Sequence, residues 1–349
     1  MLEVIQVTLK DIAVRAGVSV ATVSLALSGR GLVARGTAER LRALAEEMGY
    51  RPNPLLASLA GRRFRSPGVV GGIPLAIFNF PSMLDGSEGR PDYHRYLVEE
   101  ARKMGYAPKV YNLTNKSDSK ALFRELYHRM AQGLIITGSV DENTFGRTFD
   151  WSHFSTVQCA RFHSLHPFHT VRPNIFQAVK LAFTQLCARG YERIGFAVGQ
   201  HAEPMEDDEV RHGAAIAMEG SYLPRKHRTP VYTGGLDDKD SFLRWFDRWK
   251  PDAVVGFTVG HYWFLKNHGV RIPKDTGFAA LHLTTENDLK LFSGLCQNMA
   301  GIARQSVLLL DQMIRHRERG FTDEPLNLLV PSTWNEGRTL RKAKGDSKY

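Results

Sequence analysis

The most constraining feature of this sequence is the regular placement of helix-capping residues and glycines in its first fifty residues. Thr8 stands directly before an amphipathic stretch, and Asp11 follows three residues later, which predicts a capping box at the start of a helix over residues 9–16. Gly17 is expected to end this helix, because glycine adopts the left-handed closing conformation without strain. The sequence itself therefore delimits a short helix at both ends.

Two further short helices are expected to follow. Ser19 is placed to cap a helix over residues 20–27, which ends at Ser28 and the glycine after it, and Thr37 is placed to cap a third helix over residues 38–48. The residues expected to form their common core are Ile12, Ala13, Val18, Val23, Leu27, Leu41, Leu44, Ala45 and Met48. A helix, a tight glycine-containing turn and a second helix are the helix-turn-helix pattern, although other pairs of helices share this spacing.

Four segments of this region carry a more specific resemblance. They are residues 8–13 (TLKDIA), 16–19 (AGVS), 22–24 (TVS) and 49–53 (GYRPN). In this order, and without gaps, they resemble the DNA-binding head piece of the lactose/galactose repressor (LacI/GalR) family. The resemblance implies a bacterial-type, sequence-specific transcription regulator whose head piece covers residues 1–51.

The resemblance assigns the second helix to the major groove of DNA. Val20, Ala21 and Leu25 occupy the positions that usually read bases, and none of them has a hydrogen-bonding side chain. We therefore expect recognition of thymine methyl groups rather than bidentate hydrogen bonds, with a partly buried Leu25 as the alternative. Thr22 and Ser24 occupy positions whose hydroxyl groups contact the DNA backbone, which fixes register more than sequence.

Residues 52–65 resemble the hinge helix and linker of the same family. Asn53 followed by proline is a favourable helix start. The resemblance implies that Leu59 wedges between base steps in the minor groove, while Arg62 and the arginines after it attract phosphates. The complete set of expected DNA contacts is Thr8, Ser19, Val20, Ala21, Thr22, Ser24, Leu25, Ser28, Asn53, Leu56, Leu59, Ala60 and Arg62.

The positive charge of the chain is concentrated at its two ends. The formal net charge is +10, and residues 1–65 contain ten basic and five acidic residues, while residues 338–349 contain five basic residues and one acidic residue. The body between them is therefore nearly neutral. A basic terminal module on a near-neutral body is typical of nucleic-acid binding, although a merely solvated basic surface would carry the same charge.

Beyond a Ser-Pro-Gly break at residues 66–68, short apolar runs alternate with amphipathic stretches. Strands are expected over residues 69–80, 133–137, 155–160, 193–198, 253–257, 276–280 and 326–330. Helices are expected over residues 93–104, 120–130, 175–189, 240–249, 263–268 and 299–317. This alternation predicts parallel sheets with helices on both faces.

The family resemblance implies that residues 66–337 form an α/β, two-lobed, periplasmic-binding-protein-like core for effector binding and dimerisation. The chain would pass between the lobes three times, and the all-α head piece and hinge helix would precede this core. The acidic run at 206–209 and the basic tail at 338–349 are interpreted as solvated surface.

The resemblance also implies a small-molecule effector between the lobes. The expected ligand contacts are Phe78, Asn79, Phe80, Arg211, Thr258, Tyr262, Trp263 and His282. Residues 78–80 end the first core strand, where ligand sites of α/β sheets often lie. Thr258 and His282 stand where relatives carry amide and carboxylate pairs that bind sugar hydroxyls, so a carbohydrate is only one candidate effector. Burial in the core is the alternative for the aromatic residues at 262–263.

Together these features predict a homodimer that binds a pseudo-palindromic operator, acts as a repressor rather than an activator, and responds to a small molecule. One alternative is a DNA-binding regulator whose ligand cleft has degenerated, and the other is a solute-binding protein or an enzyme on the same core fold. The sequence contains no nucleophile-elbow, phosphate-loop or paired metal motif. No catalytic residue, cofactor or metal is therefore expected.

The histidines, the cysteines and the apolar segments of the sequence give three further expectations. His163, His166 and His169 recur every three residues, but Pro167 breaks any helix that would align them, so we expect loop histidines rather than metal ligands. The cysteines expected to be small buried residues of a reducing compartment are Cys159, Cys187 and Cys296. The sequence shows no signal-peptide start and no apolar segment of membrane-spanning length, which favours a cytoplasmic, nucleoid-associated protein.

Overall fold

The structure is a computed structural model, and it describes residues 8–27, 33–48, 72–79, 93–113, 117–137, 149–159, 167–199, 201 and 206–342. Contacts within the chain divide it into two compact units, Met1–Val69 and Val70–Tyr349. Within the described ranges, no helix combines the length and the apolar composition needed to cross a membrane.

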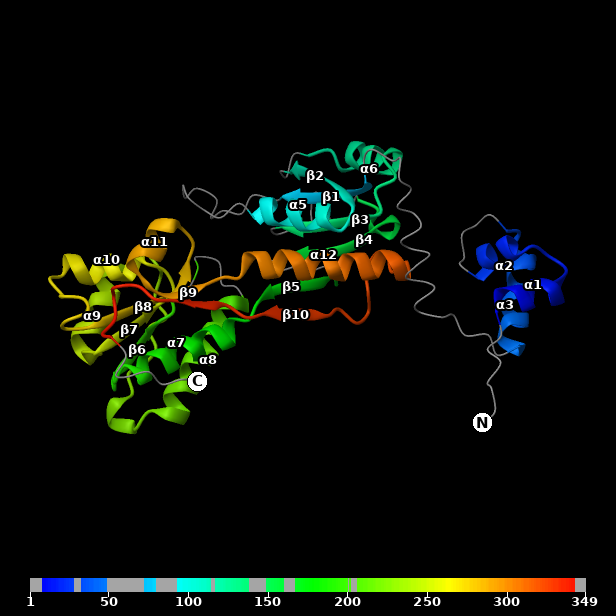
Figure 1. The fold of residues 1–349 in the computed structure, drawn as a ribbon. Helices are drawn as coiled ribbons and strands as arrows, with labels where there is room; N and C mark the ends of the chain where they lie inside the picture. Colours follow the sequence, from blue (N-terminus) through cyan, green and yellow to red (C-terminus); the bar gives the residue numbers. More distant parts are fainter. Residues whose placement is uncertain are drawn as a thin grey trace, which may run out of the picture. The chain divides into compact units, whose positions relative to one another are not determined.

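The described part of the N-terminal unit contains the helices α1 (Leu9–Ala16), α2 (Val20–Leu27) and α3 (Arg35–Glu47) (Figure 1). The predicted bounds of α1 and α2 are confirmed. The capping box is present, because the backbone N–H of Asp11 donates to Thr8 Oγ1 over 3.4 Å and that of Thr8 donates to Asp11 Oδ2 over 2.8 Å. Gly17 closes α1 with a φ of 68°.

The third helix begins earlier than the sequence predicted. The backbone N–H of Ala38 donates to the carbonyl of Ala34 over 3.0 Å, so Thr37 lies inside the first turn of α3. The prediction that Thr37 caps this helix was therefore wrong. Threonine is tolerated in the first turn of a helix, so its residue type alone does not mark where a helix begins.

The three helices share one small hydrophobic cluster. Its buried members are Ile12, Ala13, Val23, Ala26, Ala38, Leu41 and Ala45, and those packed against it are Leu9, Ala16, Val18, Leu27, Val33, Leu44 and Met48. Every residue predicted for this core is in the cluster, which confirms that the apolar periodicity was interpreted correctly.

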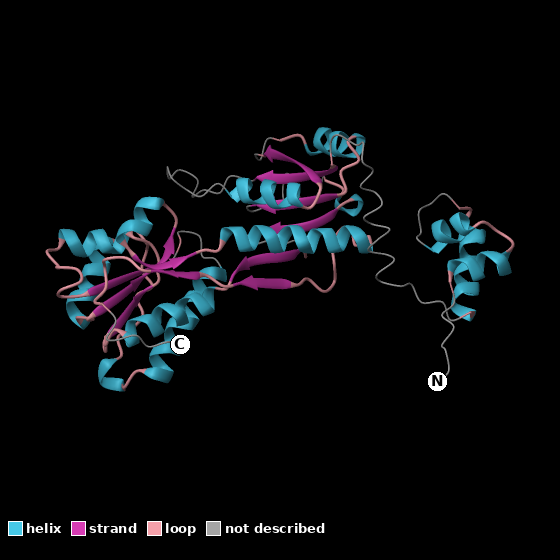
Figure 2. Cartoon of the chain, in the orientation of Figure 1, coloured by secondary structure: helices cyan, strands magenta, loops and turns pink. Residues whose placement is uncertain are grey.

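The described part of the second unit contains two sheets with helices on both of their faces (Figure 2). The first sheet has the order β10-β5-β4-β3-β1-β2, with β1 (Ile73–Asn79), β2 (Tyr106–Asn112), β3 (Gly133–Thr137), β4 (Ser155–Cys159), β5 (His169–Pro173) and β10 (Asn327–Val330). The second has the order β11-β9-β8-β7-β6, with β6 (Ile194–Ala197), β7 (Ala253–Gly256), β8 (Gly277–Leu283), β9 (Ser293–Cys296) and β11 (Thr333–Asn335). Only the pair of β11 and β9 is antiparallel among these strands. We call the two halves lobe 1 and lobe 2.

Alternate residues of each strand point to opposite faces of its sheet, and helices cover both faces. Lobe 1 contains α5 (Tyr93–Lys103), α6 (Ser119–His128) and α12 (Met299–His316). In β1, Leu75 and Ile77 pack with α5 and α12, whereas Ala76 and Phe78 pack with α6 on the opposite face. Lobe 2 contains α7 (Ile175–Ala188), α8 (Glu206–Tyr222), α9 (Lys239–Trp249), α10 (Gly260–Asn267) and α11 (Glu286–Leu291). Here α7 and α8 cover one face of the sheet and α9 and α10 cover the other.

The chain passes between the lobes three times, between β5 and α7, between β9 and α12, and between β10 and β11 (Figure 1). The carboxyl ends of β1, β2 and β3 therefore belong to lobe 1, and those of β6, β7 and β8 belong to lobe 2. This is the two-lobed α/β architecture expected from the sequence.

Several elements were not predicted. β2 is an edge strand in which only Tyr106 is buried, so it lacks the apolar run that marked the central strands. α8 begins with the acidic residues Glu206–Glu209, and their interpretation as solvated surface holds for Glu206 and Glu209 but was wrong for the two residues between them. Asp207 and Asp208 are only 8% and 6% exposed. Acidic residues are favoured in the first turn of a helix, which gives this run its place in the fold.

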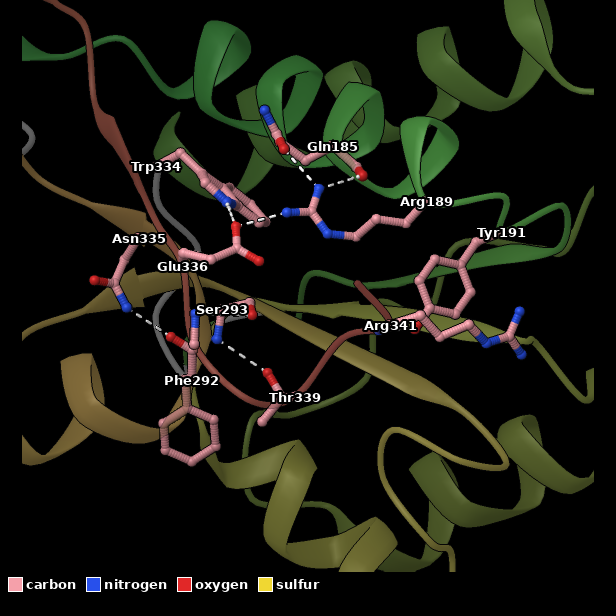
Figure 3. Close-up of polar contacts among 11 residues, drawn as sticks. Gln185, Arg189, Tyr191, Phe292, Ser293, Trp334, Asn335, Glu336, Thr339 and Arg341 are labelled. Carbon is pink, nitrogen blue, oxygen red and sulfur yellow. Dashed lines mark hydrogen bonds and ion pairs between the residues drawn. The ribbon is translucent and has the colours of Figure 1, made fainter. Parts of the chain in front are cut away.

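The basic tail was also interpreted as solvated surface, and this is wrong for its first residues. Thr339 and Leu340 are buried. Thr339 Oγ1 donates to the carbonyl of Phe278 over 2.6 Å and accepts the backbone N–H of Ser293 over 3.0 Å. The guanidinium group of Arg341 lies 4.6 Å from the ring centroid of Tyr191 (Figure 3). These contacts attach the segment to lobe 2.

A neighbouring ion pair strengthens the same attachment. Arg189 of lobe 2 is buried, and its Nη2 lies 2.6 Å from Oε2 of Glu336 (Figure 3). The Trp334 indole N–H donates to the same oxygen over 2.8 Å. Residues beyond β11 thus contact lobe 2 up to Arg341.

The cysteines differ in their surroundings. Cys159 is fully buried, and burial raises the pKa of its thiol to about 12. Cys187, in contrast, is exposed, so the expectation that all three cysteines are buried was wrong. It lies near the end of α7, on the side of the helix that faces away from the buried residues Val179, Ala182 and Leu186.

Candidate nucleic-acid interface and ligand site

Helix α2 separates its residues into a buried side and an exposed side. Val23 and Ala26 belong to the core of the N-terminal unit, whereas Val20 is 45% exposed and Ala21 and Ser24 are also exposed. Leu25 is half-buried and is not a member of the hydrophobic cluster. A short helix that presents apolar and hydroxyl side chains outward, without using them to hold the fold, is available for contact with another molecule.

Hydroxyl groups at the helix ends are engaged in capping. Ser19 Oγ accepts the backbone N–H of Thr22 over 3.0 Å, and the two hydroxyl oxygens lie 2.8 Å apart, so the predicted cap of α2 is present. Thr8 Oγ1 donates to Asp11 over 2.7 Å, which is the main reason that the pKa of the Asp11 carboxyl is lowered. These groups fix the helix starts, and Thr8, Asp11 and Ser19 are exposed at the surface. The remaining expected DNA contacts, Ser28, Asn53, Leu56, Leu59, Ala60 and Arg62, lie outside the described residues.

In lobe 1, polar side chains meet at the carboxyl ends of three adjacent strands. Asn79 Nδ2 donates to Asn112 Oδ1 over 2.8 Å, and Thr137 Oγ1 lies 3.4 Å from Asn79 Oδ1. A ring nitrogen of His94 lies 3.1 Å from the Thr137 hydroxyl. The pairing of β1 with both β2 and β3 aligns these residues in register. This edge offers neutral amide, hydroxyl and imidazole groups.

Phe78, the aromatic residue before Asn79, was also expected to contact a ligand, but it lies in the core of lobe 1. Phe78 is fully buried, and its ring lies 5.8 Å from that of Phe149 and 6.0 Å from that of Tyr111. Because Phe78 points to the face of β1 that packs under α6, it is part of the lobe 1 core and is not retained as a ligand contact. Phe80 lies outside the described residues.

In lobe 2, a buried carboxylate joins two basic side chains. Asp208 Oδ1 lies 2.7 Å from Nδ1 of His201 and also forms an ion pair with Arg211. All three residues are at least nine-tenths buried. A buried ion pair is tolerated only where charges are compensated by close partners, so this arrangement is built into the lobe.

Aromatic rings complete the lobe 2 group. The guanidinium carbon of Arg211 lies 3.7 Å from the ring centroid of Phe257, directly after β7. His282 of β8 stacks on Phe257 at 5.7 Å with an interplanar angle of 15°, and the ring of His201 lies 5.4 Å from it. We call His201, Asp208, Arg211, Phe257 and His282 the α8 cluster. It unites the predicted residues Arg211 and His282 with three that were not predicted as ligand contacts.

The other predicted ligand residues of lobe 2 differ in their surroundings. Tyr262 is buried, with its ring 4.8 Å from that of Phe292 and 5.7 Å from that of Phe278, so it is a core residue and is not retained. Trp263 is 47% exposed. The Thr258 hydroxyl accepts the backbone N–H of Gly260 over 3.3 Å and helps to start α10.

The histidine repeat also differs from expectation. His169 is a buried residue of β5 rather than a loop residue. Its Nδ1 accepts the backbone N–H of Leu326 over 2.9 Å, and its Nε2 is paired with Glu318. His163 and His166 lie outside the described residues. No group of histidine, cysteine and acidic residues that could hold a metal ion occurs in the part of the chain that the structure describes.

Comparison with known proteins agrees with this arrangement. The model of a family described as "Bacterial regulatory proteins, lacI family" matches residues 8–53. The maltose regulon regulatory protein MalI of Escherichia coli (strain K12) is 30% identical over 209 residues, and this match spans 59% of this chain and 57% of MalI. The catabolite control protein A of Staphylococcus xylosus is 23% identical over 339 residues, which are 93% of this chain and 96% of that protein.

The N-terminal unit of this chain is thus similar to bacterial regulatory proteins of the lacI family.

A solved structure of the lac repressor dimer, bound to operator and the anti-inducer ONPF, resembles this chain with a TM-score of 0.52. The sequence identity is 18%, and the match covers 96% of this chain and 99% of that one. At this identity the likeness establishes the fold, with a helical N-terminal unit followed by two α/β lobes.

The sequence missed His201 and Asp208 for a physical reason. His201 precedes α8 and Asp208 lies in its first turn, and this helix was not among those predicted because its acidic first turn was interpreted as solvated surface. The pattern that could have revealed this helix is the helical spacing of Ala214, Ala215 and Met218, which are buried against α7. Once α8 is recognised, Asp208 and Arg211 fall one turn apart on one face.

Proposed function

We propose that this chain is a homodimeric repressor of the lacI family that binds a pseudo-palindromic DNA operator and is controlled by a small molecule between lobe 1 and lobe 2. In this proposal it acts in the cytoplasm, at the nucleoid, and not as an enzyme. The observation that carries the proposal is the exposed face of α2, with Val20, Ala21 and Ser24, on a capped three-helix unit. The second helix of a helix-turn-helix module is the element that enters the major groove.

The chemistry of this face indicates what it reads. Val20, Ala21 and Leu25 offer only apolar groups to base edges. The apolar feature of the major groove is the C5-methyl group of thymine. Ser24 and Thr22 would contact phosphates, which position the helix without reading sequence. We therefore expect A·T pairs at the positions under α2.

Two copies of the chain account for the symmetry of the proposed operator. A dimer with two-fold symmetry presents two equivalent head pieces, so its DNA site carries two inverted half-sites. The small molecule acts by binding two arrangements of the lobes with different affinity, which changes the free energy of DNA binding. The polar lobe 1 edge and the α8 cluster are the described groups that support such a ligand site.

A selection experiment tests the proposal. Purified full-length protein is bound to a randomised duplex library at a fixed, moderate salt concentration, and the bound sequences are recovered and read. Enrichment of one pseudo-palindrome with A·T-rich half-sites is the expected result. Salt-sensitive binding without enrichment would show a non-specific basic module instead.

The hinge assignment has its own test. Replacing Leu59 with Ala is expected to weaken binding to the recovered operator much more than binding to unrelated DNA, because a wedge between base steps acts only at a fitted site. Equal losses on both duplexes would contradict the wedge role.

A second candidate is a DNA-binding regulator whose ligand site has degenerated. It is favoured by the pairing of Arg211 with Asp208 and by the use of Thr258 in starting α10, because both groups are already engaged within lobe 2. A thermal-unfolding screen against sugars, sugar acids and nucleosides separates the two. A ligand that stabilises the protein in proportion to its concentration supports a working site.

A further inference from the structure

An ion pair connects the two lobes beside one of the passages between them. Nη1 of Arg172 lies 3.0 Å from Oε2 of Glu206, and Nη2 lies 2.8 Å from Oε1. Arg172 belongs to β5 of lobe 1, and Glu206 is the first residue of α8 in lobe 2. The two parallel contacts make this a bidentate pair, which has stricter geometry than a single contact between charges.

The position of Arg172 makes the pair sensitive to movement of the lobes. The chain leaves lobe 1 directly after β5, where Asn174 caps α7 and its backbone N–H donates to the carbonyl of Val330 over 2.8 Å. Val330 itself precedes another passage between the lobes. A rotation at these passages changes the distance between Arg172 and α8. Hydrogen bonds of this kind are lost when the donor and acceptor separate by more than about 0.5 Å beyond their optimum.

The position of Glu206 connects the pair to the α8 cluster. Glu206 and Asp208 share the first turn of α8, and Arg211 follows one turn later. Asp208 is held by His201 and Arg211 in the interior of lobe 2. A molecule that displaces Asp208 from either partner therefore acts on the same helical turn that carries Glu206.

We propose that the Arg172–Glu206 pair is a latch that couples occupation of the α8 cluster to the relative position of the two lobes. This inference rests on the proposed regulation by a small molecule and names the contact through which it acts. With the latch closed, as in this structure, Glu206 is drawn toward lobe 1, and this attraction is also the main reason that the pKa of Arg172 is raised. With the latch open, the lobes are free to change their spacing.

The pair is poised to open rather than permanently buried. The Arg172 side chain is 21% exposed and that of Glu206 is 56% exposed. Water and salt therefore compete for both charges, and a modest gain from ligand binding is sufficient to shift the equilibrium. A fully buried pair would hold the lobes in one arrangement.

The test measures the distance between the lobes in the full-length chain. Spin labels are attached to cysteines introduced at Lys120 of α6 and Asp240 of α9, both exposed, in a background with Cys187→Ser and Cys296→Ser. Labelled protein is mixed with an excess of unlabelled chain, so that each dimer carries at most one labelled copy. Pulsed electron–electron double resonance then gives the distribution of distances between the two spin labels, in the absence of DNA and ligand.

The expected result is a broadened and shifted distribution for Arg172→Gln and for Glu206→Gln. The charge-exchanged double variant, Arg172→Glu with Glu206→Arg, is expected to restore the narrower distribution of the unmodified chain. The matched control is Arg271→Gln, which breaks the bidentate pair with Asp275 inside lobe 2, where Nη2 and Oδ1 lie 2.7 Å apart. It is expected to leave the distance unchanged.

Two outcomes would overturn the latch. One is an identical distribution for Arg172→Gln, Arg271→Gln and the unmodified chain, and the other is a double variant that stays as broad as the single ones. Coupling to the cluster is tested by Asp208→Asn, which is expected to broaden the distribution as Arg172→Gln does. An unchanged distribution for Asp208→Asn would separate the latch from the cluster and contradict the coupling.

The readout is independent of operator binding. Loss of the proposed function would appear as a failure to enrich a pseudo-palindrome, with the distances between lobes still responding to the variants. Loss of the latch would appear in the distances alone, with operator selection intact.

Discussion

The two candidate sites use their residues in opposite ways. On α2, Val20 is 45% exposed and contributes nothing to the cluster of buried residues that holds the N-terminal unit together. In the α8 cluster, Asp208 and Arg211 are only 6% and 3% exposed and bind one another in the interior. The surface proposed to read DNA is separate from the fold that carries it, whereas the residues proposed to sense a ligand are part of their fold.

This difference has a physical consequence. Substitutions on the exposed side of α2 can change what is bound at little cost in stability, because surface changes are usually within about 0.5 kcal/mol. Substitutions in the α8 cluster change stability and binding together, since each removes a partner from a buried charge. The head piece is therefore free to diversify in specificity, and the ligand site is constrained by lobe 2.

The largest effect is expected from Asp208→Ala. Removing this carboxylate leaves the buried guanidinium of Arg211 without its counter-charge, and breaking a buried pair in this way costs about 3–5 kcal/mol. Thermal or denaturant unfolding is expected to show a destabilised second unit, Val70–Tyr349, which we call the core unit. The unfolding transition of the head piece is expected to be unchanged. The control is Asp275→Ala, which removes an exposed carboxylate from the pair with Arg271. Similar stability of both variants would contradict the structural role of the cluster.

Leu41→Ala in α3 is expected to destabilise the other unit, the head piece, by a somewhat smaller free energy. Leu41 is fully buried in the head-piece cluster, and removing such a side chain costs about 2–5 kcal/mol. The head piece is expected to unfold and DNA binding to be lost, while the core unit keeps its unfolding transition. Amide hydrogen exchange of each unit measures this separately. Joint destabilisation of both units would mean that they do not fold independently.

The stability of the core unit is expected to depend on pH through Glu219 of α8. Glu219 is buried, which raises the pKa of its carboxyl from 4.5 to about 7, and it accepts a hydrogen bond from Thr229 Oγ1 over 3.2 Å. Because the folded pKa lies above the unfolded one, its contribution to stability is complete below pH 4.5 and is lost as the pH rises through 7. Glu219→Gln is therefore expected to stabilise the core unit relative to the unmodified chain at pH 8 and not at pH 5. A stability difference that is the same at both pH values would be the contrary result.

The same contrast explains what the sequence could predict. The bounds of α1 and α2 depend on local signals, namely Thr8, Gly17 and Ser19, which act within a few residues of their own position. The α8 cluster brings together His201, the start of α8, and the ends of β7 and β8, so it depends on the order of strands in the lobe 2 sheet. The meeting of Asn79 and Asn112 in lobe 1 likewise depends on the register of β1 with β2.

The failures have related causes. Thr37 was assigned as a cap from its residue type, and Asp207 and Asp208 were assigned to the surface from the charge of the acidic run. In both cases a local preference was weaker than the packing of the helix to which the residues belong. Tyr262 and Phe78 have the size and apolarity of ligand-stacking residues, but the sequence does not show which face of its element each occupies.

The most direct test of the account compares operator selection by the unmodified chain and by Val20→Gln. Glutamine can form paired hydrogen bonds with adenine in the major groove, whereas valine cannot. The variant is expected to fold normally and to enrich a pseudo-palindrome altered at one pair of symmetry-related positions, where adenine becomes preferred. Enrichment of the same sequence by both proteins, or a change in only one half-site, would contradict a symmetric dimer that reads DNA through the exposed face of α2.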